Sequence, residues 1–255
     1  MEEIIVKSTL DGTSQPSLFY YAGENKPLLV GLHTWSFGRS NQKGNMLPYA
    51  KKHGWNLLLP EFRGANVIDN PDRLKALGSP FAVQDVLDAI YYVCQNYKID
   101  QSQIFLLGLS GGGHMALMTT AKNPTLFRAV GAFVPITDML SWHAFNDAED
   151  SYRPHIEACI GGSPSEVGKN AYLERSPISY INELSKANIK LFHGKFDTTV
   201  PYTQSVELFR LITEKDGKSR VFLDLFDGGH EIDMDSAFKW FLSQVEDKNL
   251  TKVTG

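Results

Sequence analysis

The chain has 255 residues, 42% of them hydrophobic and 11% aromatic, which is enough to bury one large core in a single domain spanning residues 1–255. A count of 25 basic and 29 acidic residues gives a net charge of −4, so the charge shows no sign of a nucleic-acid partner. No apolar run approaches the length of a membrane span, and the acidic start is unlike a secretory signal; we therefore expect no membrane partner and a cytoplasmic location.

Apolar runs bounded by turn residues alternate with helical patterns along the chain, and this alternation predicts βαβ units and a mostly parallel sheet. The runs Leu28–Val30 and Leu57–Leu59 do not alternate with polar residues, as expected for strands that are covered on both faces. In chain order, the predicted strands are Glu3–Ser8, Leu18–Tyr21, Leu28–His33, Asn56–Pro60, Gln103–Leu109, Ala129–Val134, Ile189–His193 and Arg220–Phe226.

Helical stripes of apolar residues lie between these strands. One helix is expected to begin at Ser79, a cap residue that is followed by proline at the first helical position. A second follows Ser110, a third starts near Pro201, and the last carries a stripe that begins at Ala237. The stripes indicate packing against the core of an α/β protein rather than a cofactor site.

The segment from Pro135 to Lys186 has a different character, because it is rich in aromatic, small and polar residues. It separates two predicted strands and is too long for a plain crossover connection. We expect it to hold short helices that form a small lid over the carboxyl edge of the sheet. Trp142 lies in this segment and is a candidate contact for the substrate.

The stretch from Gly108 to Gly112 reads Gly-Leu-Ser-Gly-Gly and joins an apolar strand to a predicted helix. This strand, tight turn and helix form the context of a nucleophile elbow, in which small residues flank a serine at a sharp turn. Ser110 would then stand at a helix N-terminus, where developing negative charge is favoured. The alternatives are a plain glycine-rich loop between strand and helix, or a phosphate-binding loop; the stretch lacks both a G-x-G-x-x-G motif and a P-loop lysine.

A serine hydroxyl needs a base within hydrogen-bonding reach, and in this arrangement the acid and then the histidine follow the serine along the chain. His230 alone among the histidines lies beyond the last plausible acid, in a turn after the final predicted strand. Asp197 is the leading candidate for the acid because it follows the strand Ile189–His193. Asp138, which follows the preceding strand, is its rival.

The oxyanion of an acyl-transfer reaction needs two donors. The N–H of Gly111, the residue after the nucleophile, is expected to supply one. The second should come from the loop after Leu28–Leu32, with the N–H of Trp35 as first choice and Thr34 next; Thr34 is also a candidate substrate contact.

Three further polar residues lie near the predicted site. His33, at a strand end, suits a buried loop anchor better than a catalytic base. His114, one helical turn after the predicted nucleophile, is expected to pack against the sheet or to line the pocket. Arg63 would either bind a substrate carboxylate or pair with an acidic neighbour; the neighbours considered are Glu61, Asp69 and Asp72.

No metal, cofactor or reactive thiol is predicted. His143 and His155 lie in an acidic region without the spacing of a metal site; its acidic residues are Asp147, Glu149, Asp150 and Glu157. Two cysteines are too few for a disulfide framework. Cys94 is expected to be a buried thiol in a helix, and nothing near Cys159 indicates a thiolate.

Six segments carry a family pattern: Gly108–Gly113, Ser176–Ile178, Phe192–Tyr202, Gln204–Ser205, Leu208–Phe209 and Gly229–His230. In these segments the chain resembles the prolyl oligopeptidase-like branch of the α/β-hydrolases. The resemblance implies an α/β-hydrolase fold with an eight-stranded, mostly parallel sheet, helices on both faces and a small lid insertion at 135–186. It also implies Ser110 as nucleophile, Asp197 as acid and His230 as base.

Two departures from that family bear on the substrate. The chain is too short to include the large N-terminal β-propeller of the family's peptidases, and Gly111 stands where they usually carry an aromatic residue. Both departures favour the esterase-like relatives, which include acetyl-xylan esterases and general carboxylesterases.

The sequence therefore predicts a serine hydrolase that cleaves small carboxylic esters by two-step acyl transfer, without a cofactor. A serine peptidase acting on short peptides is the nearest alternative, since it differs in leaving group rather than in machinery. An inactive hydrolase fold used for binding is another, and transfer of the acyl group to an alcohol is a third.

Overall fold

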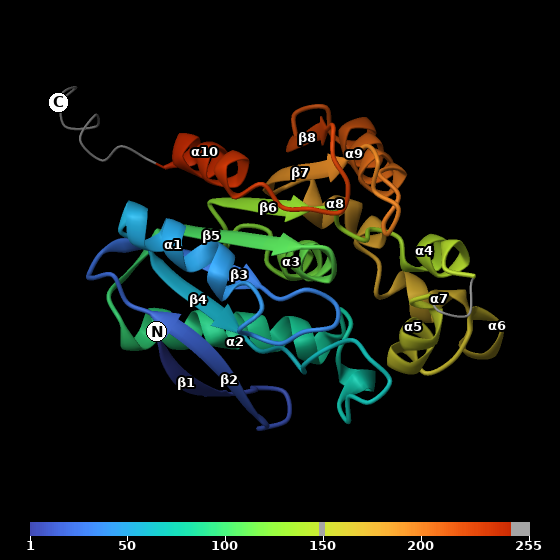
Figure 1. Ribbon diagram of the computed structural model, residues 1–255, viewed down its shortest axis with the longest axis horizontal. Coiled ribbons are helices and arrows are strands. Elements are labelled where there is room, and N and C mark those ends of the chain that lie inside the picture. Colours follow the sequence, from blue (N-terminus) through green and yellow to red (C-terminus); the bar gives the residue numbers. More distant parts are fainter. Residues whose placement is uncertain (148–150, 246–255) are drawn as a thin grey trace.

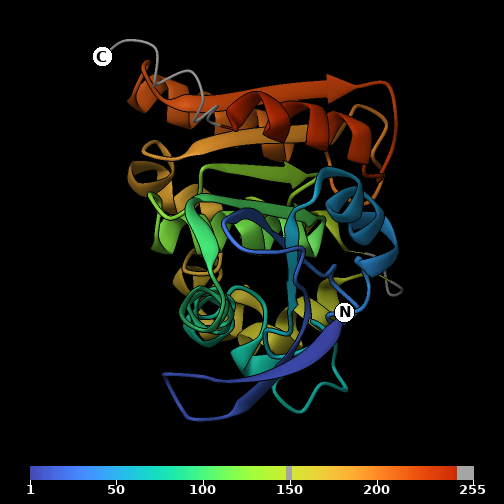
Figure 2. The ribbon, with the colours of Figure 1, turned by 90° about the vertical axis from the view of Figure 1, so that its left-hand side faces the viewer.

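The computed structural model describes residues 1–147 and 151–245. Within them, the strands form one sheet in the order β1-β2-β4-β3-β5-β6-β7-β8. The six strands from β3 to β8 run parallel to one another, whereas β2 is antiparallel to both β1 and β4. Figure 2 shows the sheet with the N-terminal strands at one edge and the C-terminal strands at the other. The mostly parallel sheet expected from the sequence is confirmed.

The bounds of the strands agree with the predicted runs to within a few residues. They are β1 (Glu2–Lys7), β2 (Ser14–Tyr20), β3 (Lys26–Leu32), β4 (Asn56–Pro60), β5 (Ile99–Leu109), β6 (Ala129–Phe133), β7 (Asn188–Gly194) and β8 (Arg220–Phe226). The residues of β4 and β6 are all buried, which explains why their sequences show no alternation of polar and apolar residues.

Helices cover both faces of the sheet. The helices α1 (Lys43–His53) and α10 (Met234–Gln244) pack on one face, where Met46 and Phe238 share one core cluster with strand residues. A second cluster holds residues of α2 (Pro80–Asn96), α3 (Gly111–Lys122), α8 (Ile181–Leu184) and α9 (Thr203–Lys215). The cap expected at Ser79 is present, since its hydroxyl accepts a hydrogen bond from the N–H of Ala82.

Sequence reasoning did not predict α1. This helix buries only Met46 and Ala50, carries Pro48 in its interior, and ends in the basic run Lys51–His53. Its apolar stripe is therefore too narrow to indicate a helix.

Short helices fill the connection between β6 and β7, as predicted for residues 135–186. They are α4 (Met139–Phe145), α5 (Arg153–Ile160), α6 (Pro164–Val167), α7 (Lys169–Leu173), the 3₁₀ turn Pro177–Tyr180 and α8. Figure 1 shows α4 to α7 beyond the arrowheads of the parallel strands, so these helices lie at the carboxyl edge of the sheet. A separate core cluster joins them to the loop after β3, through contacts that include Trp142 and Trp35.

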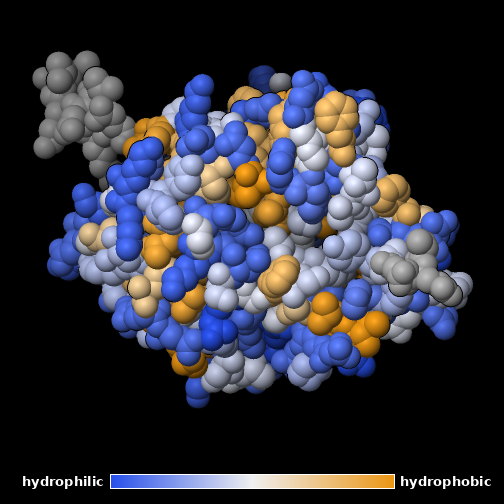
Figure 3. Space-filling model, in the orientation of Figure 1, coloured by the Kyte–Doolittle hydropathy of each residue, from blue (hydrophilic) through white to orange (hydrophobic). Residues whose placement is uncertain are grey.

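This architecture is the α/β-hydrolase fold. No helix in the described residues is long and apolar enough to cross a membrane. The face in Figure 3 is largely hydrophilic, with apolar residues in small separate groups.

Candidate active site

Ser110 lies at the sharp turn between β5 and α3. Its φ of 56° and ψ of −120° are strained for a residue with a side chain, and its N–H donates to the carbonyl oxygen of Phe133 at 2.9 Å. The turn requires the glycines around it. A Cβ on Gly108 would overlap the carbonyl of Gly112, and a Cβ on Gly112 would lie 2.7 Å from the carbonyl oxygen of Leu32. The structure thus has the backbone of a nucleophile elbow at the predicted position.

The loops after β7 and β8 bring the other two predicted residues to the same edge of the sheet. Gly194, at the end of β7, lies against the turn after β8, where a Cβ on it would overlap the carbonyl groups of Gly228 and Gly229. The N–H of Phe196 donates to the carbonyl oxygen of Gly228 at 2.9 Å. This close packing places Asp197 beside the loop that carries His230.

Asp197 accepts hydrogen bonds on both oxygens of a side chain that has no exposed surface. Its Oδ1 accepts from the N–H groups of Thr199 and Val200 at 2.8 and 2.9 Å. Its Oδ2 lies 2.7 Å from Nδ1 of His230 and 3.4 Å from Nε2 of His193. The loop therefore holds the carboxylate fixed from several sides.

Burial alone would raise the pKa of Asp197, but the hydrogen bonds from His193, His230 and the backbone of Val200 outweigh it and hold the pKa well below its usual range. Asp197 is thus an ionised acceptor, and Nδ1 of His230 must carry the proton between them. The other ring nitrogen, Nε2, then has a free lone pair. The side chain of His230 is 25% exposed, so the imidazole ring can be reached from outside the protein.

Ser110 and His230 form no hydrogen bond with one another in the part of the chain that the structure describes. Contacts of this kind are often long in unliganded enzymes and tighten when substrate binds. The structure thus joins the predicted acid and base directly, and brings the predicted nucleophile to the same sheet edge.

The two predicted oxyanion donors lie together. A Cβ on Gly111 would be 2.8 Å from the backbone nitrogen of Trp35, so the two residues are in contact. Among residues 1–147 and 151–245, the N–H groups of Gly111 and Trp35 have no acceptor in the chain. The N–H of Thr34, the second choice, donates to Oδ1 of Asn41 and is already used. These contacts favour Trp35 over Thr34 as the second donor.

Arg63 does not face the site, and its prediction as a substrate contact is wrong. Its side chain has no exposed surface and pairs with Asp85 at 2.6 Å and Asp11 at 2.9 Å. It also donates to the hydroxyl of Ser8 at 3.0 Å. The acidic partners expected from the sequence were wrong as well, because Arg63 reaches residues that lie 22 and 52 positions away along the chain.

His114 is not a substrate contact either. The residue is fully buried, and its Nε2 donates to the carbonyl oxygen of Arg175 at 2.7 Å. Burial lowers its pKa from 6.5 to about 4, so the ring is neutral at physiological pH. Arg175 in turn donates to carbonyl oxygens of Ala76 and Leu77. His114 therefore anchors the lid segment to the nucleophile helix.

Trp142 is covered by its surroundings, which contradicts its prediction as a substrate contact. The residue is 1% exposed, its Nε1 donates to the carbonyl oxygen of Thr199 at 3.0 Å, and its ring meets Trp35 edge to face. It joins α4 to the loop of the predicted acid. Thr34 is half-buried with its hydroxyl bonded to Asn41, and its contact with substrate stays a prediction.

Asp138, the rival acid, caps α4. Its Oδ1 accepts from the N–H of Ser141 at 3.0 Å, as expected for a helix N-cap. Asp227 forms an ion pair with Lys195 at 2.8 Å, so it belongs to the loop rather than to the pair made by His230. These contacts leave Asp197 as the partner of His230.

The histidines of the lid are used in local contacts. Nε2 of His143 lies 2.8 Å from Glu157, and Nδ1 of His155 accepts from the N–H of Ile68. No group of three or more metal-ligating side chains comes together in the described residues. Glu149 and Asp150 lie outside those residues. Burial raises the pKa of Cys94 to about 11 and that of Cys159 to about 12.

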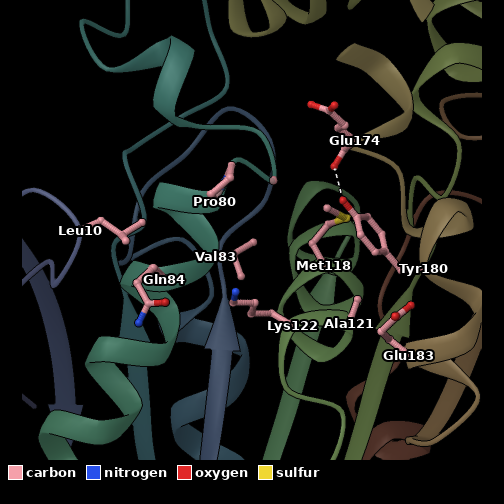
Figure 4. A pocket seen from close by; sticks show the side chains of 11 residues that line it. Leu10, Pro80, Val83, Gln84, Met118, Ala121, Lys122, Glu174, Tyr180 and Glu183 are labelled. Carbon is pink, nitrogen blue, oxygen red and sulfur yellow. Dashed lines mark hydrogen bonds between the residues drawn. The ribbon is translucent and has the colours of Figure 1, made fainter. Parts of the chain in front are cut away.

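A cavity of about 420 Å³ lies elsewhere, between the N-terminal turn of α2 and the C-terminal half of α3. Figure 4 shows Met118 and Lys122 on one wall, with Tyr180 and Glu183 facing them from the end of the lid segment. None of Ser110, Asp197 and His230 lines this cavity, so it offers a position for control substitutions.

Comparison with known proteins places these features in a family. The model of the prolyl oligopeptidase family matches residues 73–245, which is more than half of the chain. Acylamino-acid-releasing enzyme 2 of Oryza sativa subsp. japonica is 26% identical over 254 residues, which covers 94% of this chain and 31% of that protein. The inactive dipeptidyl peptidase 10 of Mus musculus is 27% identical over 150 residues, covering 58% of this chain and 17% of its own length.

Among solved structures, a puromycin-hydrolyzing peptidase of Mycobacterium tuberculosis superposes with a TM-score of 0.77 at 18% identity, covering 94% of this chain and 37% of that one. This likeness supports the α/β-hydrolase fold. The chain spans only about a third, or less, of the length of these three proteins. By the match of its residues 73–245, the chain belongs to the prolyl oligopeptidase family.

Proposed function

We propose that this chain is a serine hydrolase that cleaves amide bonds in short peptides whose N-terminus is acylated. The observation that carries the proposal is the 2.7 Å hydrogen bond between His230 and the buried carboxylate of Asp197, at the sheet edge where Ser110 occupies a nucleophile elbow. The remaining lone pair of His230 is then available to take a proton from a nucleophile.

In the proposed mechanism, Oγ of Ser110 attacks the scissile carbonyl carbon while Nε2 of His230 accepts the hydroxyl proton. The N–H groups of Gly111 and Trp35 stabilise the oxyanion that develops on the carbonyl oxygen. His230 then gives its proton to the leaving amine as the C–N bond breaks. Water, activated by His230, hydrolyses the acyl-enzyme and restores Ser110. Throughout, Asp197 holds the imidazole in the required tautomer.

The preference for amides rests on the comparisons. The sequence alone favoured esters, but the matched family and the relatives named as acylamino-acid-releasing enzymes favour the peptide alternative. The same names motivate an acylated N-terminus in the substrate. Because the machinery of ester and amide hydrolysis is shared, nothing in the geometry of Ser110 or His230 opposes this change.

A binding protein without activity is the second candidate, motivated by the relative named inactive dipeptidyl peptidase 10. Against it stand the strained backbone of Ser110 and the intact pair of Asp197 and His230. A strained turn costs stability, which a purely binding protein has no need to retain.

The test compares two substrates that share an acyl group and differ in the bond to the nitroaryl leaving group: the p-nitroanilide and the p-nitrophenyl ester of N-acetylalanine. We expect the wild-type chain to cleave both, and Ser110→Ala to lose both activities while keeping its melting temperature. Lys122→Ala, in the separate cavity, is the matched control and should retain full rates. Cleavage of the ester alone would restore the esterase interpretation, and cleavage of neither would favour the binding protein.

A further inference from the structure

His193 lies in β7 immediately behind the proposed acid, and its side chain has no exposed surface. Its Nε2 is 2.9 Å from the carbonyl oxygen of Val200 and 3.4 Å from Oδ2 of Asp197. Its Nδ1 is 2.7 Å from the hydroxyl oxygen of Ser205, in the first turn of α9. The ring therefore contacts the loop that carries Asp197 and the first turn of the helix that follows it.

These partners fix the tautomer of His193. A carbonyl oxygen can only accept, so Nε2 must carry the proton and donate it towards Val200 and Asp197. Nδ1 is then unprotonated in the neutral ring and accepts from the hydroxyl of Ser205. A buried relay results, in which Ser205 orients His193 and His193 holds the carboxylate oxygen that also faces His230.

We propose that His193 is a positioning residue, which holds the carboxylate of Asp197 at the angle that His230 needs in order to act as a base. The inference rests on the proposed function. His193 cannot be a catalytic residue in its own right, because a ring with no exposed surface cannot contact substrate. Its N–H is also among the groups that keep the pKa of Asp197 low.

Sequence reasoning missed this role. In the sequence His193 is one polar residue at the end of an apolar strand, and such a residue is usually a satisfied core group. Only the turn of the chain from β7 into α9 brings Val200 and Ser205 back onto its ring. The signal available in the sequence was the spacing of four residues between His193 and Asp197 across a tight turn.

A pair of substitutions separates a hydrogen-bonding role from mere space filling. His193→Gln can place an amide N–H near the position of Nε2, whereas the shorter side chain of His193→Asn can reproduce only the position of Nδ1. We expect His193→Asn to lower kcat on the N-acetylalanine p-nitroanilide about 10- to 100-fold with KM nearly unchanged, because the reacting groups lose their alignment. His193→Gln should recover most of the loss.

Ser205→Ala provides a milder second variant, in case His193→Asn fails to fold. It leaves the ring of His193 in place but removes the hydroxyl that selects its tautomer, so kcat should fall by a smaller factor. His53→Asn, on α1 at the end remote from Asp197, is the control for the chemical change itself and should keep full activity. Melting temperatures of all variants show whether a loss of kcat follows a loss of folding.

The outcomes distinguish this inference from the function on which it rests. If the wild-type chain is active, and His193→Asn and Ser205→Ala fold and keep wild-type kcat, the positioning role is wrong and the proposed function stands. Equal losses in His193→Gln and His193→Asn, tracking their melting temperatures, would likewise overturn it in favour of packing. If the wild-type chain does not react through Ser110, both proposals fall.

Discussion

The pairs His33–Glu61 and His230–Asp197 both lie at the carboxyl edge of the sheet, and the second is the one that fits the proposed chemistry. His33 follows β3 and lies 3.1 Å from Glu61, which follows β4. His230 follows β8 and lies 2.7 Å from Asp197, which follows β7. Each pair joins an imidazole to a carboxylate, and in each pair both residues lie shortly after parallel strands.

The difference lies in what surrounds the imidazole. The side chain of His33 is 1% exposed, its ring stacks on Phe62 at 3.8 Å, and its Nδ1 faces the carbonyl oxygen of Thr34 at 3.0 Å. Both of its ring nitrogens thus face oxygen atoms of the protein, and the buried ring is closed to a reacting group. In His230 only Nδ1 has a hydrogen-bond partner among the described residues, and the side chain is 25% exposed. A histidine–carboxylate pair becomes a candidate base only when one ring nitrogen remains available.

Among substitutions in the two pairs, Asp197→Asn is expected to have the largest effect on activity. An asparagine can donate to Nδ1 of His230, which would place the proton on Nε2 and remove the lone pair that accepts from Ser110. We expect kcat to fall about 10,000-fold with little change in KM. Hydrolysis of the N-acetylalanine p-nitroanilide at matched melting temperature is the measurement. A variant that keeps more than a tenth of wild-type kcat would show that Asp197 is not the acid.

A third histidine, His114, extends the comparison to a buried ring whose effect is on the pH dependence of folding stability. His114 is fully buried, no carboxylate pairs with it in the part of the chain that the structure describes, and burial lowers its pKa from 6.5 to about 4. As pH falls, the unfolded chain takes up the proton first, so the contribution of His114 is full above about pH 6.5 and is lost towards pH 4. The difference between these two pKa values corresponds to roughly 3 kcal/mol in the free energy of unfolding.

Urea unfolding at pH 7.5 and pH 4.5 checks this expectation. His114→Gln retains an N–H that can reach the carbonyl of Arg175 but cannot titrate, so its free energy of unfolding should decline less between the two pH values than that of the wild-type chain. An identical decline in both proteins would mean that other groups cause the acid sensitivity.

The smallest effect is expected from Glu61→Gln, the counterpart of the change at Asp197. Glu61 accepts from Arg39 and faces His33, and although burial raises its pKa, these partners hold the pKa below its usual value. Removing the charge should cost about 1 to 3 kcal/mol of stability. Activity below the melting transition should stay within about two-fold of wild type. A loss of kcat comparable to that of Asp197→Asn would mean that the two pairs do not differ as described.

The sequence was informative where function depends on local pattern and chain order. The glycines around Ser110, the aspartate after β7 and the histidine after β8 are short-range signals, and the fold places all of them at one edge. It was uninformative where a side chain meets partners far along the chain. Arg63 and Asp11 are 52 residues apart, and His114 and Arg175 are 61 apart. Such pairings depend on tertiary packing, which no local pattern encodes.

The helix α1 was missed in the sequence for a different reason. With Met46 and Ala50 as its only buried residues, it has a polar sequence, and packing against α10 stabilises it rather than its own periodicity. The sequence also could not distinguish ester from amide substrates, because hydrolysis of both uses the same catalytic side chains.

Labelling with a fluorophosphonate probe tests the central claim most directly, because the probe reacts only with a serine whose hydroxyl is activated by a neighbouring base. The labelled residue is located by mass spectrometry of the peptides. We expect a single adduct on Ser110 in the wild-type chain, much slower labelling in His230→Gln, and none in Ser110→Ala. An unlabelled wild-type chain, or labelling at an unchanged rate in His230→Gln, would contradict the account.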